Sequence, residues 1–198
     1  MKVLAATSNR GKISEISQIL SGKDISIITP QQAGISLYVE ENGETFEANA
    51  VIKALAWYRA SGIPSLADDS GLCVDALEGR PGVHTARFAG DKATDRENYE
   101  LLLRLMQNIN NREAHFVCAV ALAVSDDLVV TASGQCDGVI LHEPMGEGGF
   151  GYDPVFFDEQ SQKSFAQLSD EQKNSRSHRS RALVALRQKL MEQGVIKL

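Results

Sequence analysis

Cysteines and long apolar runs are scarce in this sequence. Only three cysteines, Cys73, Cys118 and Cys136, occur among the 198 residues, and they form no Cys-x-x-Cys pair. An odd, widely spaced set argues against a disulfide framework or a zinc site, and it predicts reduced thiols in a cytoplasmic protein. No stretch approaches the roughly 18 apolar residues of a membrane span, so we expect no association with a membrane.

Positive charge is also in short supply. The chain has 20 Lys and Arg residues against 26 Asp and Glu residues, which gives a net charge of −6. An acidic chain is a poor candidate for sequence-independent binding to DNA or RNA, which rests on neutralising phosphates. A small anionic ligand is not excluded, because a pocket can be basic inside an acidic protein. The apolar share of 43% and the charged share of 23% are typical of a globular protein with its own core.

Helical and β-rich stretches follow one another without strict alternation. Strands are predicted at residues 2–6, 25–28, 65–67, 115–124, 128–136 and 155–157, with 72–77 as a continuation of the third. Helices are predicted at residues 13–20, 45–60, 94–106 and 179–192. Thr94 to Glu97 and Ser169 to Gln172 match capping boxes at helix starts. The pattern predicts an α/β or α+β protein built on a sheet.

The first segment with chemical potential runs from Thr7 to Lys12, between a predicted strand and a predicted helix. Such a turn presents amide N–H groups, hydroxyls and cations at a helix N-terminus, which suits phosphate. It is not a P-loop, because Ala6 stands where the first glycine belongs and Ile13 follows Lys12. From these residues alone, a capped turn with a surface lysine is an equally good interpretation.

Carboxylates gather in the run Glu40–Glu47 and in the pair Asp68-Asp69, which we expect to end a strand. Carboxylates are the usual protein ligands of Mg²⁺, and ligands tend to bind at strand ends in α/β sheets. Within the run, Glu44 and Glu47 are assigned to the N-terminal end of a helix, where they complement its dipole. Asp69 precedes Ser70 and a glycine, so it also fits a turn.

A glycine-rich loop from Gly146 to Pro154 formally matches Gly-x-Gly-x-x-Gly. A dinucleotide-binding motif is rejected, because a proline and a β-rich run follow in place of a helix. Phe150 offers a flat face for a base, whereas Tyr152 is interpreted as a core residue.

A basic stretch from Lys173 to Lys189 carries six Lys and Arg residues and no acid. Within it Lys173, His178 and Arg179 are predicted to face a cleft, with a solvated helix face as the alternative.

The four segments occur in an order that is more specific than any one of them. The chain resembles the inosine/xanthosine triphosphate pyrophosphatase family, and in particular its bacterial dITP/XTP pyrophosphatase branch. The matching stretches cover nearly the whole chain and are Thr7 to Lys12, Glu40 to Phe46, Asn49-Ala50 with Lys53, Ala67 to Leu72, Pro81-Gly82-Val83 with Ala86-Arg87-Phe88, Gly148 to Pro154 and Ser177-His178-Arg179.

The resemblance implies an α/β fold with an elongated mixed sheet and flanking helices. It implies one domain over residues 1–198, with two lobes around a central cleft, and a cytoplasmic homodimer. The activity it implies is Mg²⁺-dependent hydrolysis of ITP, dITP and XTP to the monophosphate and pyrophosphate. Such an enzyme clears deaminated purine nucleotides from the pool before they enter DNA or RNA.

The resemblance also implies a role for each matching residue. Asp69 would be the general base and, with Glu40, a metal ligand, although the adjacent Glu41 leaves that second ligand open. Ser70 would touch the substrate. The triphosphate would be held by Thr7, Ser8, Asn9, Arg10, Gly11, Lys12, Lys53 and Lys173. The base and sugar would be lined by Phe150, Gly151, Tyr152, Asp153, His178 and Arg179.

Purine selection would follow from hydrogen bonding at position 6 of the base. A donor such as Arg179 or His178 pairs with the 6-oxo group of hypoxanthine and xanthine and leaves adenine unpaired. Such a mismatch can discriminate by roughly 10⁴ to 10⁵. Two alternatives remain open at this point: a pyrophosphatase for other modified or pyrimidine nucleotides, and a nucleotide-binding module without catalysis.

Overall fold

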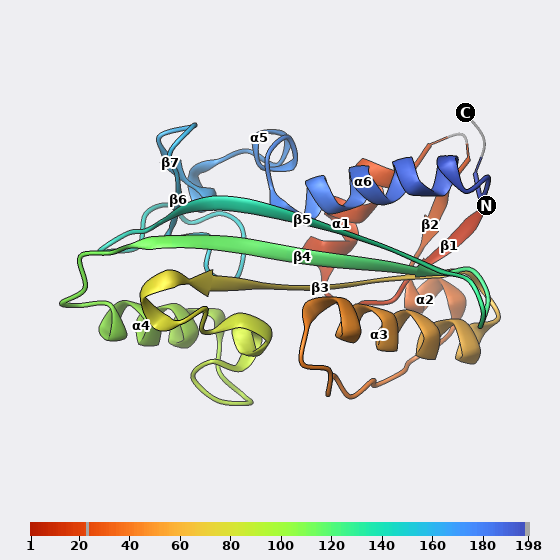
Figure 1. Cartoon of the computed structure of the whole chain (residues 1–198), viewed down its shortest axis with the longest axis horizontal. Coiled ribbons are helices and arrows are strands. Elements are labelled where there is room, and N and C mark those ends of the chain that lie inside the picture. The colour runs from red at the N-terminus through yellow and green to blue at the C-terminus, as the bar shows by residue number, and fades with distance from the viewer. Residues whose placement is uncertain (23, 197–198) are drawn as a thin grey trace. The chain divides into compact units, whose positions relative to one another are not determined.

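A mixed seven-stranded sheet with flanking helices organises the computed structural model, which describes residues 1–22 and 24–196 (Figure 1). The strand order is β2-β1-β3-β4-β5-β6-β7. The strands are β1 (Lys2–Ala5), β2 (Ser26–Ile28), β3 (Ser65–Val74), β4 (Glu113–Ala123), β5 (Val129–Ile140), β6 (Phe156–Asp158) and β7 (Lys163–Ser164). The helices are α1 (Arg10–Leu20), α2 (Pro30–Ala33), α3 (Phe46–Ser61), α4 (Asp95–Leu105), α5 (Asp170–Asn174) and α6 (His178–Glu192). The predicted α/β class is confirmed.

Strand direction changes across the sheet. β1 pairs parallel with β2 and with β3, whereas β6 pairs antiparallel with β5 and with β7. Parallel neighbours need crossovers, and helices α1 and α3 lie in the segments that link β1 to β2 and β2 to β3. Within the described residues no helix is both long enough and apolar enough to cross a membrane.

Two compact units divide the described chain. Unit 1 contains Met1–Asp69, Cys118–Gly134 and the chain from His178 onward, and unit 2 contains Ser70–Val117 and Gln135–Ser177. Strands β3, β4 and β5 contribute residues to both units. The expected single domain with two lobes and one cleft stays a prediction.

In unit 1 the sheet separates two apolar clusters. Side chains alternate between the faces of a strand, so Cys118, Val120 and Leu122 of β4 pack with α1 and α6. The alanines between them, Ala119 and Ala121, pack instead with α3. Figure 1 shows α3 on one side of these strands and α1 with α6 on the other. The long strand β4 therefore presents alternate residues to different helices.

Unit 2 has a separate, aromatic core. The predicted capping box at Thr94 and Glu97 is present and starts α4. One face of α4 buries Leu102 against β3 and β4. Phe116 and Phe156 belong to the same cluster, with ring centroids 4.6 Å apart. This core supports the glycine-rich loop, which leads into β6 rather than into a helix, as predicted.

One break in a strand was predicted wrongly. β3 is not interrupted at Asp68-Asp69 but runs through them to Val74, so the predicted continuation at 72–77 is present as far as Val74. Gly71 lies inside the strand without a positive φ rather than forming a turn, and residues on both faces of β3 are buried along its length. Burial on both faces, which the local sequence does not reveal, favours extended backbone over a turn. The short helix α2 was not predicted, although Pro30 ends β2 as expected.

Candidate active site

Asp68 and Asp69 leave β3 on opposite faces of the sheet. Leu66 belongs to the cluster with α1 and α6, and Ala67 belongs to the cluster with α3. With a side-chain period of two, Asp68 follows Leu66 and Asp69 follows Ala67. β1 ends at Ala5, which pairs with Leu66, so both carboxylates lie just beyond the carboxyl end of β1. That is the location in a parallel α/β arrangement where ligands bind.

Asp68 meets cations from both helices on its face. Its Oδ2 lies 3.0 Å from Nζ of Lys12 in α1 and accepts a hydrogen bond of 3.1 Å from Nε of Arg179 in α6. Nη1 of Arg179 also donates to Glu15. Burial alone would raise the pKa of Asp68, but Lys12, Arg179 and Lys53 outweigh it and hold the pKa far below its usual range.

The pH dependence of folding stability should carry the signature of Asp68. A carboxyl whose pKa is lower in the folded state contributes stability that is complete above its unfolded value, about 3.9. That stability is lost as pH falls from there toward the folded value. We expect the unfolding free energy of Asp68→Asn to fall less steeply than that of the wild type below about pH 4. Urea titrations across this range measure the difference, and parallel curves would contradict the assignment.

Asp69 lies on the α3 face, where α3 supplies an amide and an ammonium. Its Oδ2 accepts a hydrogen bond of 3.0 Å from Nδ2 of Asn49, and its Oδ1 lies 3.8 Å from Nζ of Lys53. Lys53 also donates to the carbonyl of Asp68 at 2.7 Å and lies 3.2 Å from Oε2 of Glu41. Burial raises the pKa of Asp69, although Lys53 and the bond from Asn49 act in the opposite direction.

The structure distinguishes the adjacent residues Glu40 and Glu41. The segment before α3 alternates, with Leu37 and Val39 packed against the unit 1 core and Tyr38 exposed. Glu41 continues the inward positions and contacts Lys53, whereas Glu40 is exposed. Among the two candidates left open by the sequence, the one beside Asp69 is therefore Glu41, and the inward alternation is the signal that would have found it.

The segment from Thr7 to Lys12 forms the capped start of α1. Asn9 is the N-cap, and its side chain accepts a hydrogen bond of 3.1 Å from the amide of Lys12. Thr7 Oγ1 accepts from the amide of Asn9. Ser8, Asn9 and Arg10 are exposed, and the Lys12 side chain is 19% exposed. The turn is therefore capped, but Lys12 points to Asp68 rather than lying on the surface. Phosphate binding by this segment stays a prediction.

In unit 2, Asp153 organises the glycine-rich loop. Its Oδ2 accepts hydrogen bonds from the amide of Phe150 at 2.9 Å and from Nζ of Lys173 at 2.6 Å. The same ammonium lies 4.3 Å from the centre of the Phe150 ring. The three predicted residues therefore form one buried ion pair with a ring held against it.

Gly149 should be the most restrictive glycine of this loop. It has φ +74°, and a Cβ there would overlap the Asp153 carboxylate. Gly151 is the matched control, because it has φ +62° and a Cβ there would meet no atom within 4 Å. Both alanine variants should lose roughly 1–2 kcal/mol for the left-handed backbone. Only Gly149→Ala should also displace Asp153. The midpoint of thermal unfolding and the rate of nucleotide turnover should therefore both be lower in Gly149→Ala than in Gly151→Ala. Equal values in the two variants would contradict this expectation.

Tyr152, Ser70 and Asp95 of unit 2 differ in their surroundings. Tyr152 is buried and its hydroxyl donates to the Thr85 carbonyl, so its interpretation as a core residue is confirmed. Its expected place beside the base and sugar stays a prediction. Ser70 is half-buried in β3. Asp95, which was not predicted, accepts a hydrogen bond of 2.7 Å from the amide of Gly151 and ties α4 to the loop.

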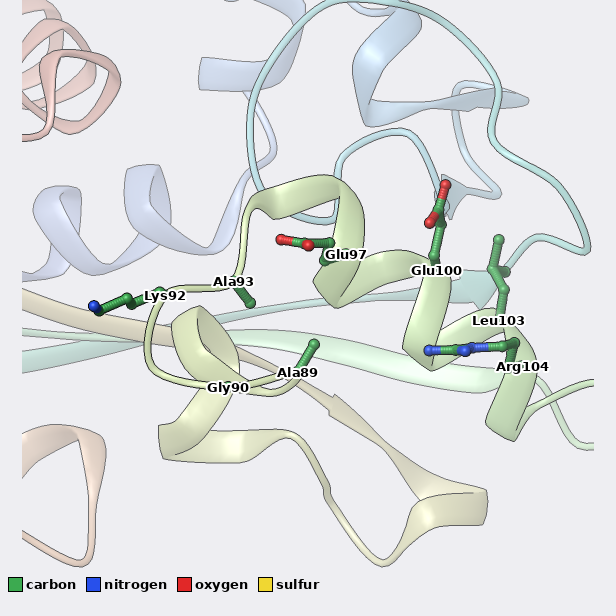
Figure 2. Close-up of a pocket in the computed structure, with 8 residues that line it drawn as sticks. All are labelled: Ala89, Gly90, Lys92, Ala93, Glu97, Glu100, Leu103 and Arg104. Carbon is green, nitrogen blue, oxygen red and sulfur yellow. The ribbon is translucent and has the colours of Figure 1, made fainter.

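Two surface hollows differ in their relation to these residues. One of about 670 Å³ in unit 1 is lined partly by Ser8 and Arg10 of the predicted phosphate segment. Another of about 690 Å³ in unit 2 lies between α4 and the loop before it and contains no predicted site residue (Figure 2). Its Glu97 already caps α4. Size alone therefore does not identify the site.

Comparisons with known proteins cover nearly the whole chain. The model of the Ham1 family matches residues 3–189. A dITP/XTP pyrophosphatase of Desulforamulus reducens is 45% identical over 185 residues, 92% of each chain, and one of Geobacter sulfurreducens is 43% identical over 196 residues, 98% of each chain.

Solved structures agree with these relatives. The Ham1 protein of Staphylococcus aureus is 38% identical with a TM-score of 0.87, and the match covers 98% of this chain and 100% of that one. A HAM1 protein of Coxiella burnetii is 36% identical with a TM-score of 0.88, over 97% of this chain and 99% of that one.

Proposed function

The chain belongs to the Ham1 family, and we propose that it hydrolyses ITP, dITP and XTP to the nucleoside monophosphate and pyrophosphate. Relatives that match almost end to end carry the name dITP/XTP pyrophosphatase. The observation that carries the proposal is the convergence of the buried Asp69 and of Glu41 on the Lys53 ammonium. A base and a cation site side by side suit hydrolysis of a phosphoric anhydride.

In this proposal Asp69 takes the proton from the water that attacks the α-phosphorus. A carboxylate whose pKa is raised by burial is a stronger base than one in water, which is the direction that general base catalysis needs. The hydrogen bond from Asn49 to Oδ2 orients the carboxylate, whose Oδ1 lies 3.8 Å from Nζ of Lys53. Asn49 is therefore an orienting residue, which the sequence motif contained but the residue-by-residue assignment omitted.

The triphosphate is assigned to three lysines. Lys12 and Lys53 in unit 1 are held in place by carboxylates, and so is Lys173 in unit 2. Cations that are already fixed before reaction stabilise the charge that develops on the leaving pyrophosphate without reorganising. The exposed Ser8, Asn9 and Arg10 keep their predicted role beside Lys12.

Mg²⁺ fits the same pair of carboxylates. Glu41 and Asp69 both approach one ammonium, so they surround a position that a cation already favours. No cluster of three or more metal-binding side chains occurs in residues 1–22 and 24–196, and Mg²⁺ commonly needs only one or two carboxylates besides water and phosphate. When bound, Mg²⁺ would supply charge stabilisation at the phosphates. Glu41 and Asp69 are the residues proposed to hold it.

The purine is assigned to Phe150, His178 and Arg179. Phe150 supplies a ring face, held by Asp153 and Lys173. Arg179 is buried, with Nε and Nη1 bonded to Asp68 and Glu15, so its predicted contact with the 6-oxo group stays a prediction, as does that of His178. The homodimer and the cytoplasmic location also rest on the resemblance.

A pyrophosphate-release assay tests the function. The purified protein should release pyrophosphate from dITP, ITP and XTP in the presence of Mg²⁺, and EDTA should stop it. dATP, dGTP and dTTP should be poor substrates. Preferential release from a modified or pyrimidine nucleotide would favour the alternative substrate class. Saturable ITP binding without release would favour a binding module.

Glu41→Gln and Glu40→Gln form a matched pair that tests the metal assignment. Both changes remove one carboxylate from the same loop, but only Glu41 contacts Lys53. We expect Glu41→Gln to lower kcat by about 10- to 100-fold and to raise the Mg²⁺ concentration needed for half-maximal rate. Glu40→Gln should stay close to the wild type. The reverse order of effects would return the role to Glu40.

A further inference from the structure

We propose that Asp68 is a positioning residue for Lys12, and that Glu15 and Arg179 hold Asp68 in the orientation that this requires. The inference rests on the proposed function, in which Lys12 binds the triphosphate. It adds two residues, Glu15 and Asp68, that the resemblance does not assign to the site.

The contacts in unit 1 form one continuous chain from Glu15 through Arg179 and Asp68 to Lys12. Glu15 binds Nη1 of Arg179, and Arg179 Nε bonds Oδ2 of Asp68 at 3.1 Å. The same Oδ2 lies 3.0 Å from Nζ of Lys12. A single carboxylate oxygen is thus shared by two cations from different helices. Its position fixes where the Lys12 ammonium lies.

Solvent exposure is lowest in the middle of this chain of contacts, at Arg179 and Asp68. The side chains of Asp68 and Arg179 are 1% and 2% exposed, and that of Glu15 is 10% exposed. Lys12, at 19%, is the most exposed of the four and neighbours the exposed Ser8 to Arg10 turn. Of the four groups, Lys12 is therefore the one best able to meet a ligand, and the other three act through it.

The sequence spacing explains how the chain of contacts is built. Lys12 and Glu15 are three residues apart on α1, so they share one face of the helix. That face turns toward β3 and α6, because Ile16 beside it is buried in the cluster that includes α6. One helix thus supplies both ends of the network, and rotation of α1 would break both at once.

Holding the Lys12 side chain in place lowers the entropy that is lost when a ligand binds to it. A free lysine side chain loses much rotamer entropy when a ligand fixes it. An ammonium that is already held stabilises developing charge without that cost. The carboxylates of Asp68 and Glu15 are balanced by Lys12 and Arg179, so the four groups together carry no net charge. Asp68 therefore orients Lys12 without adding a net negative charge that would repel a phosphate.

A double-mutant cycle distinguishes positioning from a purely structural role. The four proteins are wild type, Asp68→Asn, Lys12→Met and the double variant, with kcat/KM for dITP as the readout. Asp68→Asn should lower kcat/KM by about 10-fold in the wild type, within the range of measured coupling between contacting residues. In the Lys12→Met background the same change should lower it by less than about 2-fold. Equal losses in both backgrounds would overturn the proposal.

A second variant guards against misfolding of Asp68→Asn. Glu15→Gln acts on Lys12 through two intervening residues, Arg179 and Asp68, and keeps the shape of the side chain. It should lower kcat/KM by a smaller factor, and this loss should also disappear in the Lys12→Met background. Asp126→Asn removes an acid from an exposed ion pair in unit 1 and should leave kcat/KM unchanged. Thermal unfolding of every variant shows which ones are folded at the assay temperature.

Binding of inorganic tripolyphosphate keeps this inference separate from the proposed function. Calorimetry on the same four proteins should show the same coupling without any turnover. If the wild type hydrolyses dITP but the cycles are additive, the positioning role fails and the proposed function stands. If the wild type does not hydrolyse dITP, the proposed function fails and the tripolyphosphate cycle decides the inference. Additive binding or no binding would then overturn it.

Discussion

Asp69→Asn should reduce kcat for dITP by about 10²- to 10⁴-fold, the range that a general base contributes. The asparagine amide cannot take a proton from water, but its oxygen can still accept the hydrogen bond from Asn49. Folding should be unharmed. Because burial disfavours the charged form of Asp69, a neutral side chain should leave the thermal midpoint unchanged or slightly higher.

Two measurements separate an effect on catalysis from an effect on nucleotide binding. Pyrophosphate release gives kcat, and calorimetric binding of dITP shows whether the site still accepts the nucleotide. Asp126→Asn, which alters an exposed acid of unit 1, is the matched control and should behave as the wild type. A folded Asp69→Asn protein with kcat within about 3-fold of the wild type would remove Asp69 from the mechanism.

The largest effect on stability should come from Arg179→Met. Arg179 is 1% exposed and bonds two carboxylates, Asp68 and Glu15, that are themselves buried. Methionine fills similar space but supplies no charge, so both carboxylates lose a partner. Breaking a buried ion pair from one side costs about 3–5 kcal/mol. We expect the unfolding free energy from urea titration to fall by this amount.

Arg59→Met is the matched control for that measurement. Arg59 also bonds a carboxylate, with 2.6 Å between its Nε and Asp126 Oδ1, but the two side chains are 62% and 58% exposed. Solvent screens such a pair, which contributes about 1 kcal/mol or less. The contrast between the two variants isolates the effect of burial. Similar losses would show that Asp68 and Glu15 find other partners when Arg179 is absent.

Local patterns predicted much of the secondary structure. The capping boxes predicted at Thr94 and at Ser169 depend on residues three apart, and both are present, at the starts of α4 and α5. The first part of the chain was predicted as a strand, a polar turn and a helix. The structure has this order, and Asn9 of the turn caps α1. These features depend on groups that lie within a few residues of one another. These features can therefore be predicted from the sequence without knowledge of the tertiary structure.

The residues of the candidate site and their contacts could be predicted only in part from local sequence. The pair Asp68-Asp69 was found, but a break in the strand was expected there before its continuation at 72–77, whereas β3 runs unbroken to Val74. Glu41 and Glu40 could not be separated without the inward packing of Leu37 and Val39. Arg179 was expected at the base, and its bonds to Asp68 and Glu15 were not foreseen. Each of these depends on neighbours far away in the sequence.

The sequence by itself determined the class of fold, the residue types of the site and, through the ordered motifs, the family. The tertiary structure decided which residues meet. Alternation along β3 sends Asp68 to α1 and α6 and Asp69 to α3, but only the packed sheet brings those helices to opposite faces. Contacts such as Asp68 with Arg179 join residues far apart in the chain, and no local pattern encodes them. The residue types thus determine which chemistry is possible, and the packing of the sheet and helices determines which residues are paired to perform it.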